Sequence, residues 1–180
     1  RKLVKPIVKA LVYAYEKHNI SHRDIKLENI LIMKDGTIKL GDWGLAAFKT
    51  NDRKCSTSCG TLGYMAPEII CRKKYDANKT DVWALGVVLF SLCSGVRPYG
   101  EPKNRQKNPK DISWKDEWLN AIMNRKWAVW WKSHELQTNS IKNFSFELRD
   151  MIECMFEPDS NKRISLTKLL KHSWMCKTIN

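Results

Sequence analysis

The segment from His22 to Asn29 contains the residue types that phosphoryl transfer requires. Asp24 offers a carboxylate for an attacking hydroxyl, and Lys26 offers a cation for the moving phosphoryl group. Asn29 supplies a carbonyl oxygen, and Asp42, in a later Asp-Trp-Gly segment, supplies a second carboxylate. Because magnesium prefers such oxygen ligands, Asn29 and Asp42 are candidate metal ligands.

A third short motif, Ala66-Pro67-Glu68, follows these two in the chain. Any one of these residues, taken alone, is more simply interpreted as a charge on a surface loop. The complete ordered set within less than a third of the chain favours a shared chemical purpose.

The three motifs resemble the catalytic loop, the magnesium loop and the end of the activation segment of eukaryotic protein kinases. The resemblance implies that Asp24 is the catalytic base and that Lys26, Asn29 and Asp42 bind the cofactors, ATP and magnesium. Lys26 follows Asp24 by two residues, which is similar to serine/threonine kinases rather than tyrosine kinases. The implied activity is transfer of the γ-phosphate of ATP to protein hydroxyls.

Residues 60–68 resemble the substrate-docking segment of those kinases. In this resemblance Thr61 is a further catalytic residue that forms hydrogen bonds towards Asp24 and Lys26.

Residues 55–60, Cys-Ser-Thr-Ser-Cys-Gly, resemble the activation loops of the calmodulin-dependent and AMP-activated kinase group. Thr57 takes the position of the activating phosphothreonine, which implies an upstream activating kinase, and Arg23 is its expected partner. The alternative is an unmodified loop threonine. Competing acceptors are Ser56, Ser58 and Thr50.

Five further residues have structural roles in the resemblance. Trp43 replaces the usual phenylalanine of the magnesium loop and stacks with His22, so its larger ring requires space among its neighbours. Asp81 anchors the backbone of the catalytic loop. Glu68 and Arg163 form a buried ion pair, for which the alternative is two surface charges.

The elements that must position these residues follow from the hydrophobic pattern. Helical spacing predicts an amphipathic helix over residues 3–18, with Pro6 as a possible break or kink. Asp35-Gly36 predicts a hairpin between residues 30–33 and 37–40. Residues 80–94 are apolar all round, which predicts a buried central helix. Shorter helices are expected at residues 67–71, 145–155 and 166–171.

The expected fold is therefore mainly α (α+β), a helical bundle around a buried central helix with a short β-hairpin near the catalytic loop. Residues 1–180 resemble the large C-terminal lobe of a kinase domain. A glycine-rich loop and a strand lysine, which belong to the small lobe, do not occur in the sequence. We therefore expect a fragment of a longer protein that is inactive in isolation. The alternative function is a non-catalytic, pseudokinase-like scaffold or binding module.

Composition limits the partners. The net charge of +13 favours anionic partners, but the basic residues are scattered and no nucleic-acid-binding motif occurs, so protein substrates and ATP are expected. The longest apolar run, residues 82–96, is too short to span a bilayer. Six cysteines without a CxxC pair favour a reducing compartment, cytoplasmic or nuclear.

Overall fold

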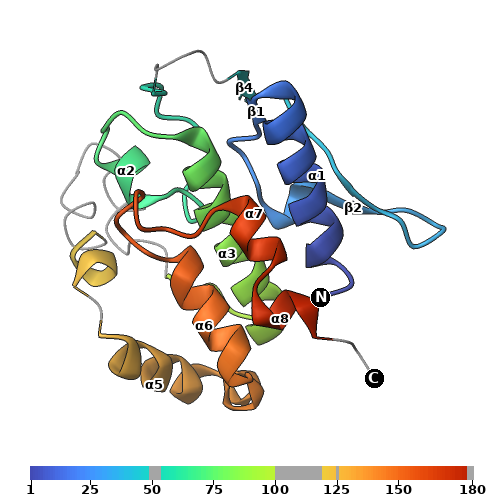
Figure 1. The fold of residues 1–180 in the computed structure, drawn as a ribbon. Helices are drawn as coiled ribbons and strands as arrows, with labels where there is room; N and C mark the ends of the chain where they lie inside the picture. Colours follow the sequence, from blue (N-terminus) through green and yellow to red (C-terminus); the bar gives the residue numbers. More distant parts are fainter. Residues whose placement is uncertain (49–53, 100–118, 125, 178–180) are drawn as a thin grey trace.

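The computed structural model describes residues 1–48, 54–99, 119–124 and 126–177 (Figure 1). The helices are α1 Val4–His18, α2 Pro67–Ile70, α3 Ala77–Ser94, α5 Trp127–Gln137, α6 Phe146–Met155, α7 Leu166–Leu170 and α8 Ser173–Cys176, with 3-10 turns η1 Leu27–Asn29 and η2 Asn139–Asn143. The strands β1 Ile20–Ser21, β2 Ile30–Ile32, β3 Ile38–Leu40 and β4 Ala47–Phe48 form two antiparallel pairs, β1 with β4 and β2 with β3. The predicted fold class, mainly helical with a short hairpin, is confirmed.

Helix α3 forms the centre of the core, with α1, α6 and α7 around it (Figure 1). Fourteen of its eighteen residues are buried, which explains why its sequence is apolar on every side. The Asp76 side chain caps its first turn by accepting a hydrogen bond from Asn78 N, and Gly95 ends it with a φ of 78°. The helix begins three residues before the predicted start at Thr80.

Helix α1 accommodates its proline without a break. It begins at Val4, so Pro6 lies in the first turn, where backbone N–H groups need no partner inside the helix. The predicted kink is therefore unnecessary. The buried face of α1 packs in the main core, and its last turn ends at Asn19, whose φ is 54°.

The β2–β3 hairpin has the predicted position. Ile30 pairs with Leu40, and Gly36 adopts a φ of 80° in the turn. Beyond the paired residues, Gly41 N donates a hydrogen bond of 2.8 Å to Asn29 O. The hairpin thus holds the residue before Asp42 against the end of the catalytic loop.

Within the described ranges, no helix combines the length and the apolar character that crossing a membrane requires.

Candidate active site

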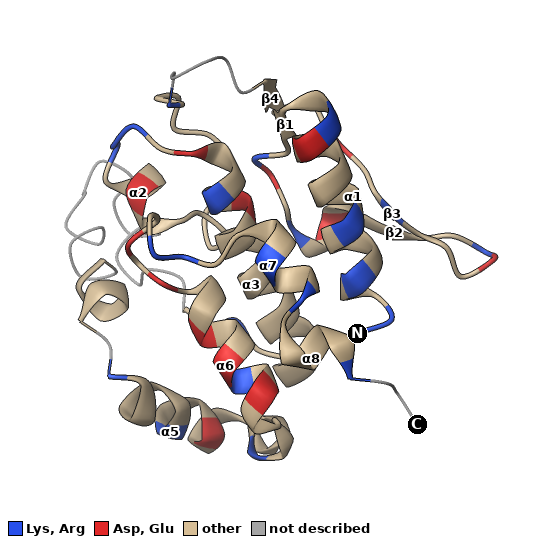
Figure 2. Cartoon of the chain, in the orientation of Figure 1, with Lys and Arg blue, Asp and Glu red and all other residues tan. Residues whose placement is uncertain are grey.

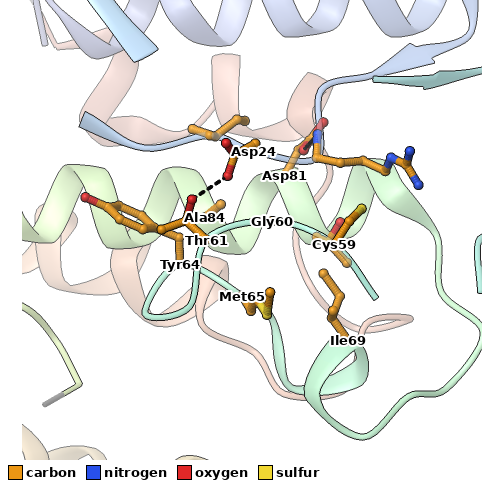
Figure 3. Close-up of a pocket in the computed structure, with 12 residues that line it drawn as sticks. Asp24, Cys59, Gly60, Thr61, Tyr64, Met65, Ile69, Asp81 and Ala84 are labelled. Carbon is orange, nitrogen blue, oxygen red and sulfur yellow. Dashed lines mark hydrogen bonds between the residues drawn. The ribbon is translucent and has the colours of Figure 1, made fainter. Parts of the chain in front are cut away.

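Asp24 lies where the catalytic loop meets the segment before α2. Its carboxylate accepts hydrogen bonds of 2.7 Å from both Lys26 Nζ and Thr61 Oγ1, and Lys26 Nζ also lies 3.1 Å from Thr61 Oγ1. Figure 3 shows Asp24 and Thr61 facing each other from the two segments. The contacts expected for Thr61 are therefore present.

These contacts control the charge of Asp24. Burial raises the pKa of its carboxyl, but the hydrogen bonds from Lys26 and Thr61, with the charge of Lys26, together hold the pKa below its ordinary value. The pKa of Lys26 is raised mainly by its hydrogen bond to Asp24. Asp24 is therefore a carboxylate at neutral pH, as an acceptor of a hydroxyl proton must be.

Asp81 of α3 holds the backbone of the loop. Its carboxylate accepts hydrogen bonds from His22 N at 2.7 Å and from Arg23 N at 2.8 Å. Burial raises the pKa of Asp81 to about 7, against the lowering effect of these two donors. Arg23 has a φ of 67°, so the loop is held in a strained conformation beside Asp24.

The rings of His22 and Trp43 are in contact at a centroid distance of 4.6 Å, tilted by 57° rather than stacked. His22 Nδ1 accepts a hydrogen bond of 3.3 Å from Asp24 N, which leaves Nε2 to donate to Gly41 O at 2.9 Å. These partners define a neutral imidazole. Trp43 is 37% exposed, and its Nε1 donates a hydrogen bond of 3.1 Å to Leu40 O.

The candidate magnesium ligands, Asn29 and Asp42, flank the open end of the hairpin: Asn29 precedes β2 and Asp42 follows β3. Asn29 donates its amide Nδ2 to Asp24 O at 2.8 Å, which orients its carbonyl oxygen away from that group. Asp42 is exposed and has a φ of 55°. The left-handed backbone conformation of this turn is therefore adopted by Asp42 itself and not by Gly44, two residues later. One amide oxygen and one exposed carboxylate form a donor set that fits magnesium shared with phosphates.

Thr57 is exposed, and within the described residues no hydrogen bond joins its side chain to Arg23. The Arg23 Nε group donates to Leu45 O at 2.7 Å instead. Thr50, one of the competing acceptors, lies outside the described residues.

Tyr75, which the sequence analysis missed, organises this loop. Its backbone forms a bridge with Cys55 through two hydrogen bonds of 2.9 Å, and its hydroxyl donates to Thr57 O at 2.7 Å. Tyr75 is 2% exposed and lies in a small apolar cluster with Ile69 and Ala77. A single tyrosine between two lysines and an aspartate has no periodic signal that identifies this role.

Glu68 and Arg163 form the expected pair. Arg163 Nη1 and Nη2 donate to Glu68 Oε1 and Oε2 at 2.7 and 2.9 Å, a bidentate geometry. Arg163 is 1% exposed, and its remaining donors reach Lys79 O and Glu157 O at 2.8 Å. The pair joins the segment before α3 to the loop between α6 and α7.

A narrow pocket lies beneath the contact between Asp24 and Thr61 (Figure 3). Its volume is about 10 Å³, which is roughly enough for one water molecule. The pocket is therefore a small gap between the two segments and is too small for a nucleotide.

The chain belongs to the protein kinase family. Residues 1–175 match the family model described as Protein kinase domain. The chain is 35% identical over 176 residues to a human SNF-related serine/threonine-protein kinase. It is 32% and 31% identical, over 180 and 182 residues, to CBL-interacting protein kinases 5 and 26 of Oryza sativa subsp. japonica.

The predicted resemblance to serine/threonine kinases is therefore confirmed. The alignments cover 97%, 98% and 99% of this chain but only 20%, 34% and 32% of those relatives. The chain thus spans between a fifth and about a third of their lengths.

Proposed function

We propose that this chain is the large lobe of a serine/threonine kinase that transfers the γ-phosphate of ATP to protein hydroxyls. The observation that supports this most directly is the Asp24 carboxylate, held by Lys26 and Thr61 at hydrogen-bond distance. A surface carboxylate without a catalytic purpose has no need of a cation and a hydroxyl from two separate segments.

In the proposed reaction, Asp24 orients the substrate hydroxyl and accepts its proton as the new bond to phosphorus forms. Lys26 donates hydrogen bonds towards the transferring phosphoryl group, where negative charge is spread over the equatorial oxygens. Thr61 keeps the docking segment in register with Asp24. Asn29 and Asp42 are the residues that would hold magnesium, which would supply positive charge to offset that of the phosphates.

Transfer also requires a small lobe in this proposal. Apolar side chains lie exposed on the β2–β3 hairpin, namely Leu31, Ile32 and Met33, and Trp43 shortly after β3 is also exposed. Such a group of exposed apolar residues is typical of an interaction surface. A small lobe seated there would cover these residues and supply the phosphate-binding backbone and the strand lysine.

The decisive variant is Asp24→Asn in a form of the protein that carries a small lobe. Because Asp24 acts on the hydroxyl rather than on the nucleotide, transfer to a serine peptide should fall by about 10²–10⁴-fold while ATP affinity is retained. The control is Asp35→Asn, an exposed turn carboxylate whose loss should leave transfer unchanged. Steady-state phosphotransfer and ATP binding by calorimetry are the two measurements.

Parental turnover in Asp24→Asn would contradict the assigned role. The alternative function, a non-catalytic binding module, predicts instead that the parent protein binds partners but shows no phosphotransfer with any peptide, even with the small lobe present.

A further inference from the structure

Three side chains that the proposed catalysis does not use meet between α6 and the start of α8. They are Asp150, Cys154 and His172, and one ligand atom of each lies within 4.8 Å of the others. Figure 1 shows α6 and α8 side by side, and contacts between the two helices are among those of the core.

Local structure fixes all three positions. Asp150 and Cys154 are four residues apart on α6, so their side chains lie on one face of the helix. His172 caps α8: its Nδ1 accepts a hydrogen bond of 3.3 Å from Trp174 N. Its Nε2 therefore carries the proton and donates to Asp150 Oδ2 at 3.1 Å.

The thiol completes the group. Within the described residues, no hydrogen bond reaches the Cys154 sulfur, although it faces the paired His172 and Asp150. The local charge also attracts cations, because the carboxylates of Asp150, Glu153 and Glu157 act on this thiol. Figure 2 shows several acidic positions along α6, in a chain whose net charge is +13.

We propose that Asp150, Cys154 and His172 bind a zinc ion. Sulfur, imidazole nitrogen and carboxylate oxygen are the three ligand types that zinc takes in proteins, at about 2.0–2.3 Å from the ion. Small side-chain rotations draw the three atoms around one such centre, and water fills the fourth position. Two ligands come from α6 and one from the cap of α8, so the ion fastens the last helix to the core.

The protons balance as follows. The Cys154 thiol releases one proton to solvent when its sulfur binds zinc. The imidazole proton of His172 moves from Nε2 to Nδ1, and the cap hydrogen bond from Trp174 N is lost. The simpler interpretation is a histidine cap held by Asp150 beside an idle thiol, and it predicts no response to metal.

The test adds Zn²⁺ or Co²⁺ to the purified protein. Zn²⁺ should raise the melting temperature, and Co²⁺ should give the near-ultraviolet charge-transfer band of a cobalt thiolate. Cys154→Ser should abolish the band. Asp150→Asn and His172→Asn should weaken zinc binding by more than the roughly 10–100-fold that loss of an outer partner of a ligand costs. Asparagine can still cap a helix, so His172→Asn separates metal binding from capping.

The matched control is Cys176→Ser, an exposed cysteine that lies four residues from His172. It should keep both the band and the parental zinc affinity, measured by competition with a chromogenic chelator. A parent protein without the cobalt band, or a band that survives Cys154→Ser, overturns the proposal.

Discussion

At the residue scale, Asp24 depends on groups that are distant in the sequence. Its partner Thr61 lies 37 residues further on, and Asp81, which holds the two preceding backbone N–H groups, lies on α3. Asp24 itself is 7% exposed, so its charge is stabilised by these few contacts rather than by bulk water. The geometry of one carboxylate is therefore a property of the whole folded chain.

His22 should make stability dependent on pH. Burial lowers its pKa below the ordinary value of about 6.5, against the raising effect of its hydrogen bond to Gly41. At this residue the folded state then binds fewer protons than the unfolded state, so the contribution of His22 to the free energy of unfolding should decrease as the pH falls below about 6.5, opposite in sign to that of Asp81. Urea unfolding between neutral and mildly acidic pH measures this.

The control for this prediction is His22→Gln, in which the titrating group is absent. Every other histidine and carboxylate is shared by the two proteins, so the difference between their pH profiles isolates His22. Parallel profiles for parent and variant would contradict the assignment of a lowered pKa.

At the element scale, the ion pair of Glu68 and Arg163 joins α2 to the loop before α7. Because Arg163 is buried and bidentate, Arg163→Ala leaves Glu68 unpaired in the interior and should cost about 3–5 kcal/mol. Chemical denaturation measures the loss. The matched control is Lys162→Ala, the neighbouring residue, whose contact with Asp159 is exposed and 3.9 Å long. Equal stability of the two variants would mean that the pair is no more than a surface contact.

The loop around Thr57 is the second element for which we predict a function. A phosphate on the exposed Thr57 would add nearly two negative charges close to the turn that Tyr75 organises. Arg23 would then exchange its bond to Leu45 O for a stronger, charge-assisted pair with the phosphate. This exchange would order the loop and position Thr61.

In a protein with a small lobe, both Thr57→Ala and Arg23→Ala should lower kinase activity. The loss of activity in the double variant should be much smaller than the sum of the two single losses, because both changes remove the same contact. Mass spectrometry of the loop identifies which hydroxyl carries the phosphate. Undiminished activity in Thr57→Ala, together with a loop free of phosphate, would reject this switch.

At the scale of the whole molecule, catalysis should require more than this lobe. Leu31, Ile32 and Met33 on the β2–β3 hairpin are exposed apolar residues of the kind that a second lobe would cover. The 180-residue chain alone should therefore show no significant phosphotransfer, and adding a small lobe should restore it. Turnover by the chain alone, measured with radiolabelled ATP, would refute the proposal that phosphotransfer needs a small lobe.

The sequence by itself determined the family and the main elements. Ordered short motifs identify Asp24, Lys26, Asn29 and Asp42 as candidates because phosphoryl transfer demands particular residue types at short spacing. The hairpin and the buried helix were predictable because turn chemistry and hydrophobic period are local properties. Helix ends were less so: the start of α3 depends on the cap at Asp76.

Only the tertiary structure decided which distant groups meet. Hydrophobic periodicity does not predict the contact of Tyr75 with the loop around Thr57 or the exposed position of Trp43. It also does not predict the cluster of Asp150, Cys154 and His172. Each depends on side chains brought together by packing around α3, and contacts between distant segments follow from the way the helices close on one core rather than from any local pattern.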